Sequence, residues 1–246
     1  MQITFTVKQP FNFQNYSYVV VFNTQGNGVT PRANGTQTAY AGYSFAIVVS
    51  GAGGSVSATP YYFQRPNGNP NAAPILLPVN AVAGQLQFNL NSNGQNNQFT
   101  VLFNRVLASA YATPTPSGTA TASPTASASP SPSPTATATA SGASPTASPT
   151  ATPPSLVATT WQFNYFVVQG SIQTGAVLVS GVQGGTAGTI VDSLGANPTG
   201  ATDATYTSPN LDTTASFDTG PVYPQPGTHS SDQSAQILSG DISNNP

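Results

Sequence analysis

One tetrapeptide, Phe217-Asp218-Thr219-Gly220, contains the Asp-Thr-Gly sequence with which aspartic proteases present one carboxylate of a pair that shares a proton. This chemistry needs two carboxylates, and the only second candidate, Asp192-Ser193-Leu194-Gly195, has a residue inserted, so a partner would have to come from a homodimer. Ser216 and Pro221 also stand where the aspartic-protease pattern has an apolar residue and a small one. The sequence therefore favours a turn between short strands over a protease dyad.

A serine nucleophile is the next chemistry that the sequence suggests. The segment 42–46 (Gly-Tyr-Ser-Phe-Ala) approximates the nucleophile elbow of α/β-hydrolases, which needs a strand before the serine and a helix after it. The residues that follow are Ile47-Val48-Val49, which predict a strand and place Ser44 on its polar face. The single histidine, His229, could orient a serine, but its neighbours are typical of a solvated loop.

The acidic residues offer few further sites. All six are Asp and none is Glu, so the carboxylate pair of a glycosidase would have to be two Asp from C-terminal loops. Their spacing lacks the alternating oxygen ligands of a calcium loop, and no phosphate-binding loop occurs. We therefore expect no catalytic residue, no metal and no cofactor.

The aromatic residues suggest a binding surface instead. Tyr61, Tyr62 and Phe63 form the densest cluster, and with Trp161 they permit a platform on which sugar rings could stack. Consecutive strand residues point to opposite faces, so at most two of the three clustered rings share a surface. Packing in a core is the alternative use of Tyr61, Tyr62 and Trp161, and the sequence favours it.

The composition limits the partners of the chain. Only 4% of the 246 residues are charged, so solubility depends on Asn, Gln, Ser and Thr, as in many extracellular all-β proteins. The four cations precede the six Asp residues and are too dispersed to neutralise a nucleic-acid backbone. No apolar run approaches the roughly 18 residues of a membrane span, there is no cysteine, and no signal peptide is visible.

A low-complexity tract divides the chain. From Thr113 to Pro154 every residue is Pro, Ser, Thr, Ala or Gly, so the tract has no large apolar side chain to bury. This composition predicts a disordered, extended insert, and it resembles O-glycosylated stalks.

The sequence patterns of both flanking segments predict β-strands. In residues 1–112, Ile3, Phe5 and Val7 alternate with polar residues, 16–22 and 43–49 are suited to central strands, and 56–64 contains Pro60, which predicts an edge or a bulge. Residues 86–90 and 99–103 alternate around Asn93-Gly94 and predict a hairpin.

In residues 155–246 the pattern predicts a half-buried strand at 161–169, with further strands at 176–182, 189–191 and 235–242. Because this segment has too few large apolar residues for its own core, we expect it to complete the fold of the first. The prediction is one discontinuous, all-β domain: an Ig-like antiparallel β-sandwich made of 1–112 and 155–246, interrupted by the insert at 113–154.

Four stretches carry a resemblance to uncharacterised bacterial cell-envelope proteins, which are often predicted lipoproteins. They are VVVFNTQGNGVTP (19–31), TWQFNYFVV (160–168), DSLGANPTGATDATYTSPNLDTTASFDT (192–219) and AQILSGDISN (235–244). The resemblance implies export and a single β-rich domain, and it brings no known activity. The chain departs from that family in lacking the lipid-bearing cysteine.

These observations predict a non-enzymatic secreted or cell-surface protein with a structural or adhesive role. Its expected partners are cell-wall or extracellular polysaccharide or other surface proteins, without nucleic acid. A carbohydrate-binding module on a glycosylated stalk is the second hypothesis, and an aspartic-type hydrolase that uses Asp218 is the third.

Overall fold

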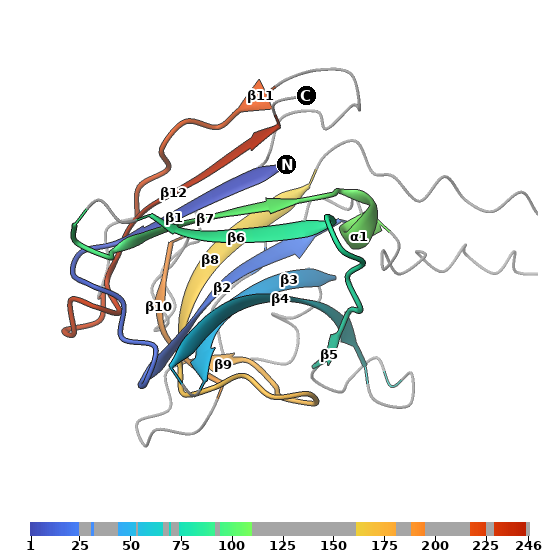
Figure 1. Ribbon diagram of the computed structural model, residues 1–246. Coiled ribbons are helices and arrows are strands. Elements are labelled where there is room, and N and C mark those ends of the chain that lie inside the picture. The colour runs from blue at the N-terminus through green and yellow to red at the C-terminus, as the bar shows by residue number, and fades with distance from the viewer. Residues whose placement is uncertain are drawn as a thin grey trace, which may run out of the picture.

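The computed structural model describes residues 1–24, 31, 44–52, 54–65, 69, 74–91, 94–109, 161–180, 188–194, 217–224 and 229–244. The tract at 113–154 lies outside these residues. The predicted all-β class is confirmed in the described part, where one helical turn, α1 (Val106–Ser109), is the exception among the strands (Figure 1). No helix there has the length and apolar character to span a bilayer.

The first sheet joins the two ends of the chain. Its strands, in spatial order, are β11 (Phe217–Asp218), β12 (Ile237–Asn244), β1 (Gln2–Val7), β7 (Gln98–Phe103) and β6 (Leu86–Asn91). All four pairings are antiparallel. The N-terminal strand β1 lies between β7 and β12, and β12 comes from the C-terminal segment (Figure 1). The predicted hairpin of β6 and β7 is present, with Gly94 at φ 82° where the turn needs a left-handed residue.

The second sheet has seven strands and also draws on both segments. Its order is β5 (Ile75–Pro78), β4 (Ser55–Gln64), β3 (Phe45–Ala52), β2 (Tyr16–Asn23), β8 (Gln162–Gln169), β10 (Thr189–Ser193) and β9 (Val179–Ser180). Here β8 pairs with β2 over eight residues, which is the pairing expected for this strand. All pairings are antiparallel except that of β9 with β10, which is parallel.

Two strand predictions need correction. The strand that contains Pro60 is interior rather than at an edge, because β4 lies between β3 and β5. The proline is tolerated because the register of β5 ends at Tyr61, so its missing N–H falls just past the ladder. The strand expected at 176–182 is reduced to β9 in the described residues, since the Ala176 carbonyl instead accepts a hydrogen bond from the N–H of Leu76 in β5.

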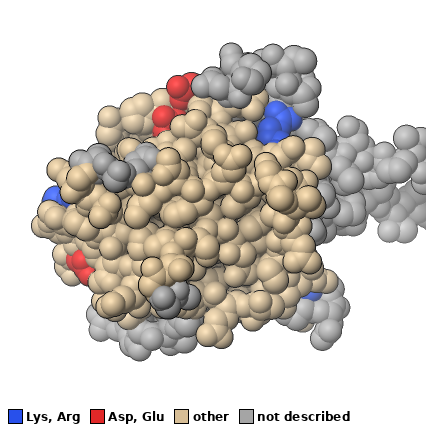
Figure 2. Space-filling model, viewed as in Figure 1, with Lys and Arg blue, Asp and Glu red and all other residues tan. Residues whose placement is uncertain are grey.

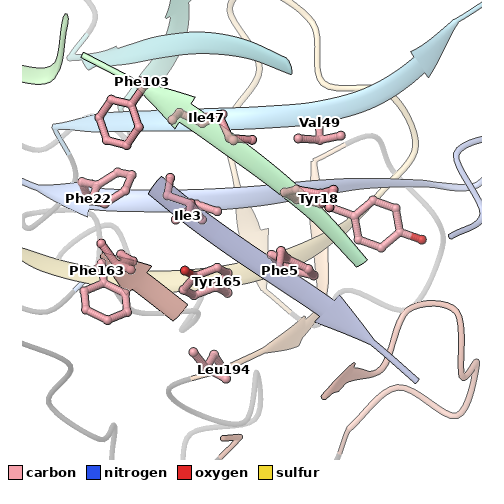
Figure 3. Close-up of a cluster of buried hydrophobic side chains, with 14 of the residues drawn as sticks. Ile3, Phe5, Tyr18, Phe22, Ile47, Val49, Phe103, Phe163, Tyr165 and Leu194 are labelled. Carbon is pink, nitrogen blue, oxygen red and sulfur yellow. The ribbon is translucent and has the colours of Figure 1, made fainter. Parts of the chain in front are cut away.

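The two sheets share a hydrophobic core. Side chains from the inner face of β1, such as Ile3 and Phe5, meet Tyr18 of β2 and Tyr165 of β8 from the other sheet (Figure 3). Alternation of apolar and polar residues in β1 and β7 turns one face of each strand toward this core. The five-stranded sheet therefore has a buried inner face and an outer face lined by the intervening polar residues.

A second hydrophobic cluster covers the other face of the seven-stranded sheet. It contains Phe166 and Val168 of β8, with Ile172 and Leu178 from the segment that follows β8. Seven of the eight β8 residues are buried, and this cluster accounts for Phe166 and Val168 on the outer face of the strand. The half-buried strand predicted at 161–169 is therefore wrong, because the sequence pattern gave no sign that later residues would cover its second face.

Candidate functional site

The outer face of the five-stranded sheet is lined mainly by hydroxyl and amide side chains. Cross-strand neighbours form three rows over β12, β1, β7 and β6: Ser243, Gln2, Leu102 and Gln87; Asp241, Thr4, Thr100 and Asn89; and Ser239, Thr6 and Gln98. We call these residues, without Leu102 and the buried Ser243, the polar face. Neighbouring strands are spaced by about 4.8 Å and same-face residues along a strand by about 6.8 Å, so the rows form a regular array.

The polar face is uncharged apart from its β12 edge. None of its residues is Lys or Arg, and in Figure 2 charged side chains are few and scattered over the visible surface. Hydroxyl and amide side chains each carry both donor and acceptor groups; for example, Gln98 Nε2 donates to Thr6 Oγ1 at 3.0 Å. The array is thus suited to neutral ligands that carry many hydroxyl groups, and it offers no counter-charge to an anion.

Two carboxylates meet at the β11–β12 edge of this face. Asp218 of β11 lies opposite Ser243, and its carboxylate is a neighbour of that of Asp241 in β12. Burial raises the pKa of Asp241, and repulsion from the neighbouring Asp218 raises this pKa further. Two neighbouring carboxylates are the groups from which the dyad of an aspartic protease is built.

The surrounding bonds hold this carboxylate pair in a turn. The N–H of Gly220, which has φ 60°, donates to Asp218 Oδ1 at 2.8 Å. The Thr219 hydroxyl donates to Asp241 Oδ1 at 3.1 Å and accepts from the N–H of Ile242 at 3.0 Å. The carboxylate beside Asp218 is thus that of Asp241 in the same chain, whereas the sequence, in which Asp192 did not fit the motif, pointed to a homodimer. Only the register of β11 against β12 reveals this partner.

Asp192 lies elsewhere and serves as a buried acceptor. Its fully buried carboxylate, in β10, accepts from the N–H of Ile237 at 2.9 Å, the N–H of Ser193 at 2.8 Å and His229 Nδ1 at 2.8 Å. Burial raises the pKa of Asp192, and the hydrogen bonds from Ile237, His229 and Ser193 oppose this change. Because Ile237 begins β12, this carboxylate links the two sheets, and His229 is bound to it.

The hydroxyl of the candidate serine, Ser44, is already engaged in hydrogen bonds to main-chain groups. The Ser44 hydroxyl is buried, donates to the carbonyl of Phe22 at 3.1 Å, accepts from the N–H of Thr24 at 2.8 Å, and lies 2.9 Å from Thr24 Oγ1. These bonds close the end of the β2–β3 pair. Gly42 and Tyr43 of the candidate elbow lie outside the described residues.

The aromatic residues proposed for sugar stacking lie largely inside the protein. Trp161 is 1% exposed and packs edge-on to Phe22, with the ring centroids 5.8 Å apart. Tyr61 is 8% exposed, and burial raises its pKa. Tyr62 is half-buried against the core between the sheets. The sequence favoured a role for these rings in core packing, and their positions agree with that role.

Among the described residues there is no group of three or more His, Cys, Asp or Glu side chains that could hold a metal ion. Asp203 and Asp212 lie outside the described part. No protein-family model, curated protein or solved structure matches this chain.

Proposed function

We propose that this chain is a non-enzymatic secreted or cell-surface protein with a structural or adhesive role, and that its two sheets form an Ig-like β-sandwich. The observation that carries the proposal is the polar face: a cross-strand array of hydroxyl and amide groups on the outside of a sheet whose other side is a packed core. The low charge of the chain and its resemblance to cell-envelope proteins support an extracellular setting.

The chemistry of the polar face favours a neutral, polyhydroxylated surface such as cell-wall or extracellular polysaccharide. A single hydrogen bond made in competition with water contributes only about 0.5 to 1.5 kcal/mol, so each contact is weak. A polymer presents the same groups repeatedly, and many weak contacts made together hold it strongly. This mode of binding needs no aromatic platform, which is consistent with the buried positions of Tyr61 and Trp161.

The experiment is a binding screen of the purified full chain against a glycan array and against insoluble neutral and anionic polysaccharides. We expect retention on at least one neutral polysaccharide and none on anionic ones. If the chain binds no polysaccharide, polysaccharide is ruled out as its partner, and only the structural role among surface proteins remains of the proposal. Recovery of the native protein only from the cytosol of its host would contradict the secreted or cell-surface location.

The pairing of Asp218 with Asp241 favours one second candidate, an aspartic-type hydrolase. Two carboxyl groups that share a proton can act as general acid and general base toward a peptide bond. Asp218 is exposed, however, and water screens the interactions on which such a dyad depends. Peptide release from casein that is blocked by a transition-state inhibitor of aspartic proteases and lost in Asp218→Asn would establish this candidate over the adhesive one.

A further inference from the structure

Of the four sheet edges in the described part of the chain, three are protected against pairing with another strand. The edge strands β11 and β9 have two residues each, and β11 carries the charged Asp218. The edge strand β5 ends in Pro78, and its Leu76 already accepts from the N–H of Gly175 and donates to the carbonyl of Ala176. Short length, charge, proline and a covering segment are the devices by which proteins prevent edge-to-edge association.

Among the described residues, the fourth edge strand, β6, has none of these devices. Its six residues, Leu-Gln-Phe-Asn-Leu-Asn, include no charged residue and no proline, and they pair with β7 without a bulge. No described strand pairs with its other side. It is thus a regular and uncharged template for a further strand.

The hydrogen-bond pattern defines which groups face this open edge. The N–H of Asn104 donates to the carbonyl of Gln85 at 2.8 Å, so residue 85 directs its main-chain groups toward β7. Because these groups alternate in direction along an antiparallel strand, Gln87 and Asn89 also face β7, whereas Leu86, Phe88 and Leu90 direct their N–H and C=O groups outward.

The side chains around β6 are also incompletely covered. Leu86, Phe88 and Leu90 point toward the core but are only half-buried, whereas the inner-face residues of β1 and β7 are buried. At the end of β6 near Leu86, three apolar side chains are strongly exposed: Val82 (68%), Val106 (62%) and Leu102 (44%). A strand added along β6 would cover apolar surface as well as satisfy main-chain groups.

We propose that β6 is a self-association edge at which a second copy of the chain pairs its own β6 antiparallel. A pairing centred on residue 88 matches all the outward groups, because it places Leu86 opposite Leu90 of the partner subunit and Phe88 opposite its own copy. Two identical strands carry identical charges, and the absence of any charge on β6 removes the repulsion that would oppose such a pair. The pairing joins two five-stranded sheets into one and places both polar faces on the same side.

The centred register makes a specific test possible, because it sets residue 87 of one copy opposite residue 89 of the other. Both side chains are exposed on the outer face, so charged replacements there leave the core intact. The double variant Gln87→Lys/Asn89→Lys puts like charges opposite each other, whereas Gln87→Asp/Asn89→Lys puts opposite charges together. The experiment is sedimentation velocity of the full chain over a concentration series, with thermal melting to verify that each variant is folded.

We expect the unchanged chain to form a dimer, the two-lysine variant to raise the dimer dissociation constant by about tenfold or more, and the Asp/Lys variant to retain the dimer. Since the chain has no cysteine, Phe88→Cys should also give an oxidised covalent dimer, whereas Ser57→Cys, exposed on β4, should not. A monomer at every concentration, open polymers, or equal dissociation constants for the two double variants would overturn the proposal. It does not depend on the adhesive role.

Discussion

Replacing Asp192 by Ala should remove a large part of the stability of the fold. The substitution leaves the buried N–H groups of Ile237 and Ser193 without their acceptor, and each such group costs about 1 to 3 kcal/mol. His229 is part-exposed and can bond to water instead. Burial has raised the pKa of Asp192, so the folded protein pays for keeping this carboxylate charged, and removing the carboxylate offsets part of the cost. We therefore expect a net decrease of about 3 kcal/mol in the free energy of unfolding.

Equilibrium unfolding in urea measures this loss. The chain has one tryptophan, Trp161, which is 1% exposed and next to β8, so its fluorescence reports on the region between the sheets. The midpoint should fall while the slope with denaturant stays the same, because the surface exposed on unfolding is unchanged. A loss of this size is about one fifth to three fifths of the 5 to 15 kcal/mol by which a domain is typically stable.

Two matched variants separate the buried link from a general effect of losing a charge. Asp218→Ala removes an exposed carboxylate and should change stability by less than about 0.5 kcal/mol. His229→Ala should cost less than Asp192→Ala, because the carboxylate keeps both main-chain donors. If Asp192→Ala costs no more than Asp218→Ala, then Asp192 does not hold the two sheets together.

Three further predictions follow from the contacts described above. In Asp218→Asn, the pKa of Asp241, measured by carboxyl NMR titration, should fall toward its usual value of 3.8. It should stay above that value, because burial is the larger cause of the raised pKa and remains in the variant. An unchanged pKa would mean that the two carboxyl groups do not interact. Gly240→Ala should destabilise the protein by about 1 to 3 kcal/mol, because its Cβ would lie 2.6 Å from Tyr165 Cε2, whereas Ser239→Ala on the opposite face should be nearly neutral in the same urea assay. Replacing residues 113–154 by a short Gly/Ser loop should keep a single thermal transition and change stability by only about 1 kcal/mol, because both sheets contain strands from either side of the tract; two separate transitions would contradict one cooperative unit.

The elements that could be predicted from the sequence are those whose signal is local. Strict alternation in Ile3, Phe5 and Val7 identifies β1 and its buried face, and the turn at Gly94 identifies the β6–β7 hairpin. Burial of β8 on both faces was not predictable, because Ile172 and Leu178 cover it only once the chain has folded back.

The site was predictable only in part, for a similar reason. The sequence identified Asp218 by its motif and, because Asp192 did not fit, placed its partner in a homodimer, whereas the register of two paired strands brings Asp241 beside it. The polar face likewise required the order of β12, β1, β7 and β6, since no single strand reveals which others lie beside it. Local patterns defined what each strand presents, and long-range pairing determined what lies next to it.

The most direct test of the adhesive role compares two variants for retention on the neutral polysaccharide that the unchanged chain binds best. Thr4→Ala/Thr100→Ala removes two neighbouring hydroxyl groups from the middle row of the polar face, and Ser55→Ala/Ser57→Ala removes two exposed hydroxyl groups from β4 in the other sheet. We predict that the first variant loses most of its retention and the second keeps it, with both folded by thermal melting. Equal retention of the two variants would contradict binding through the polar face.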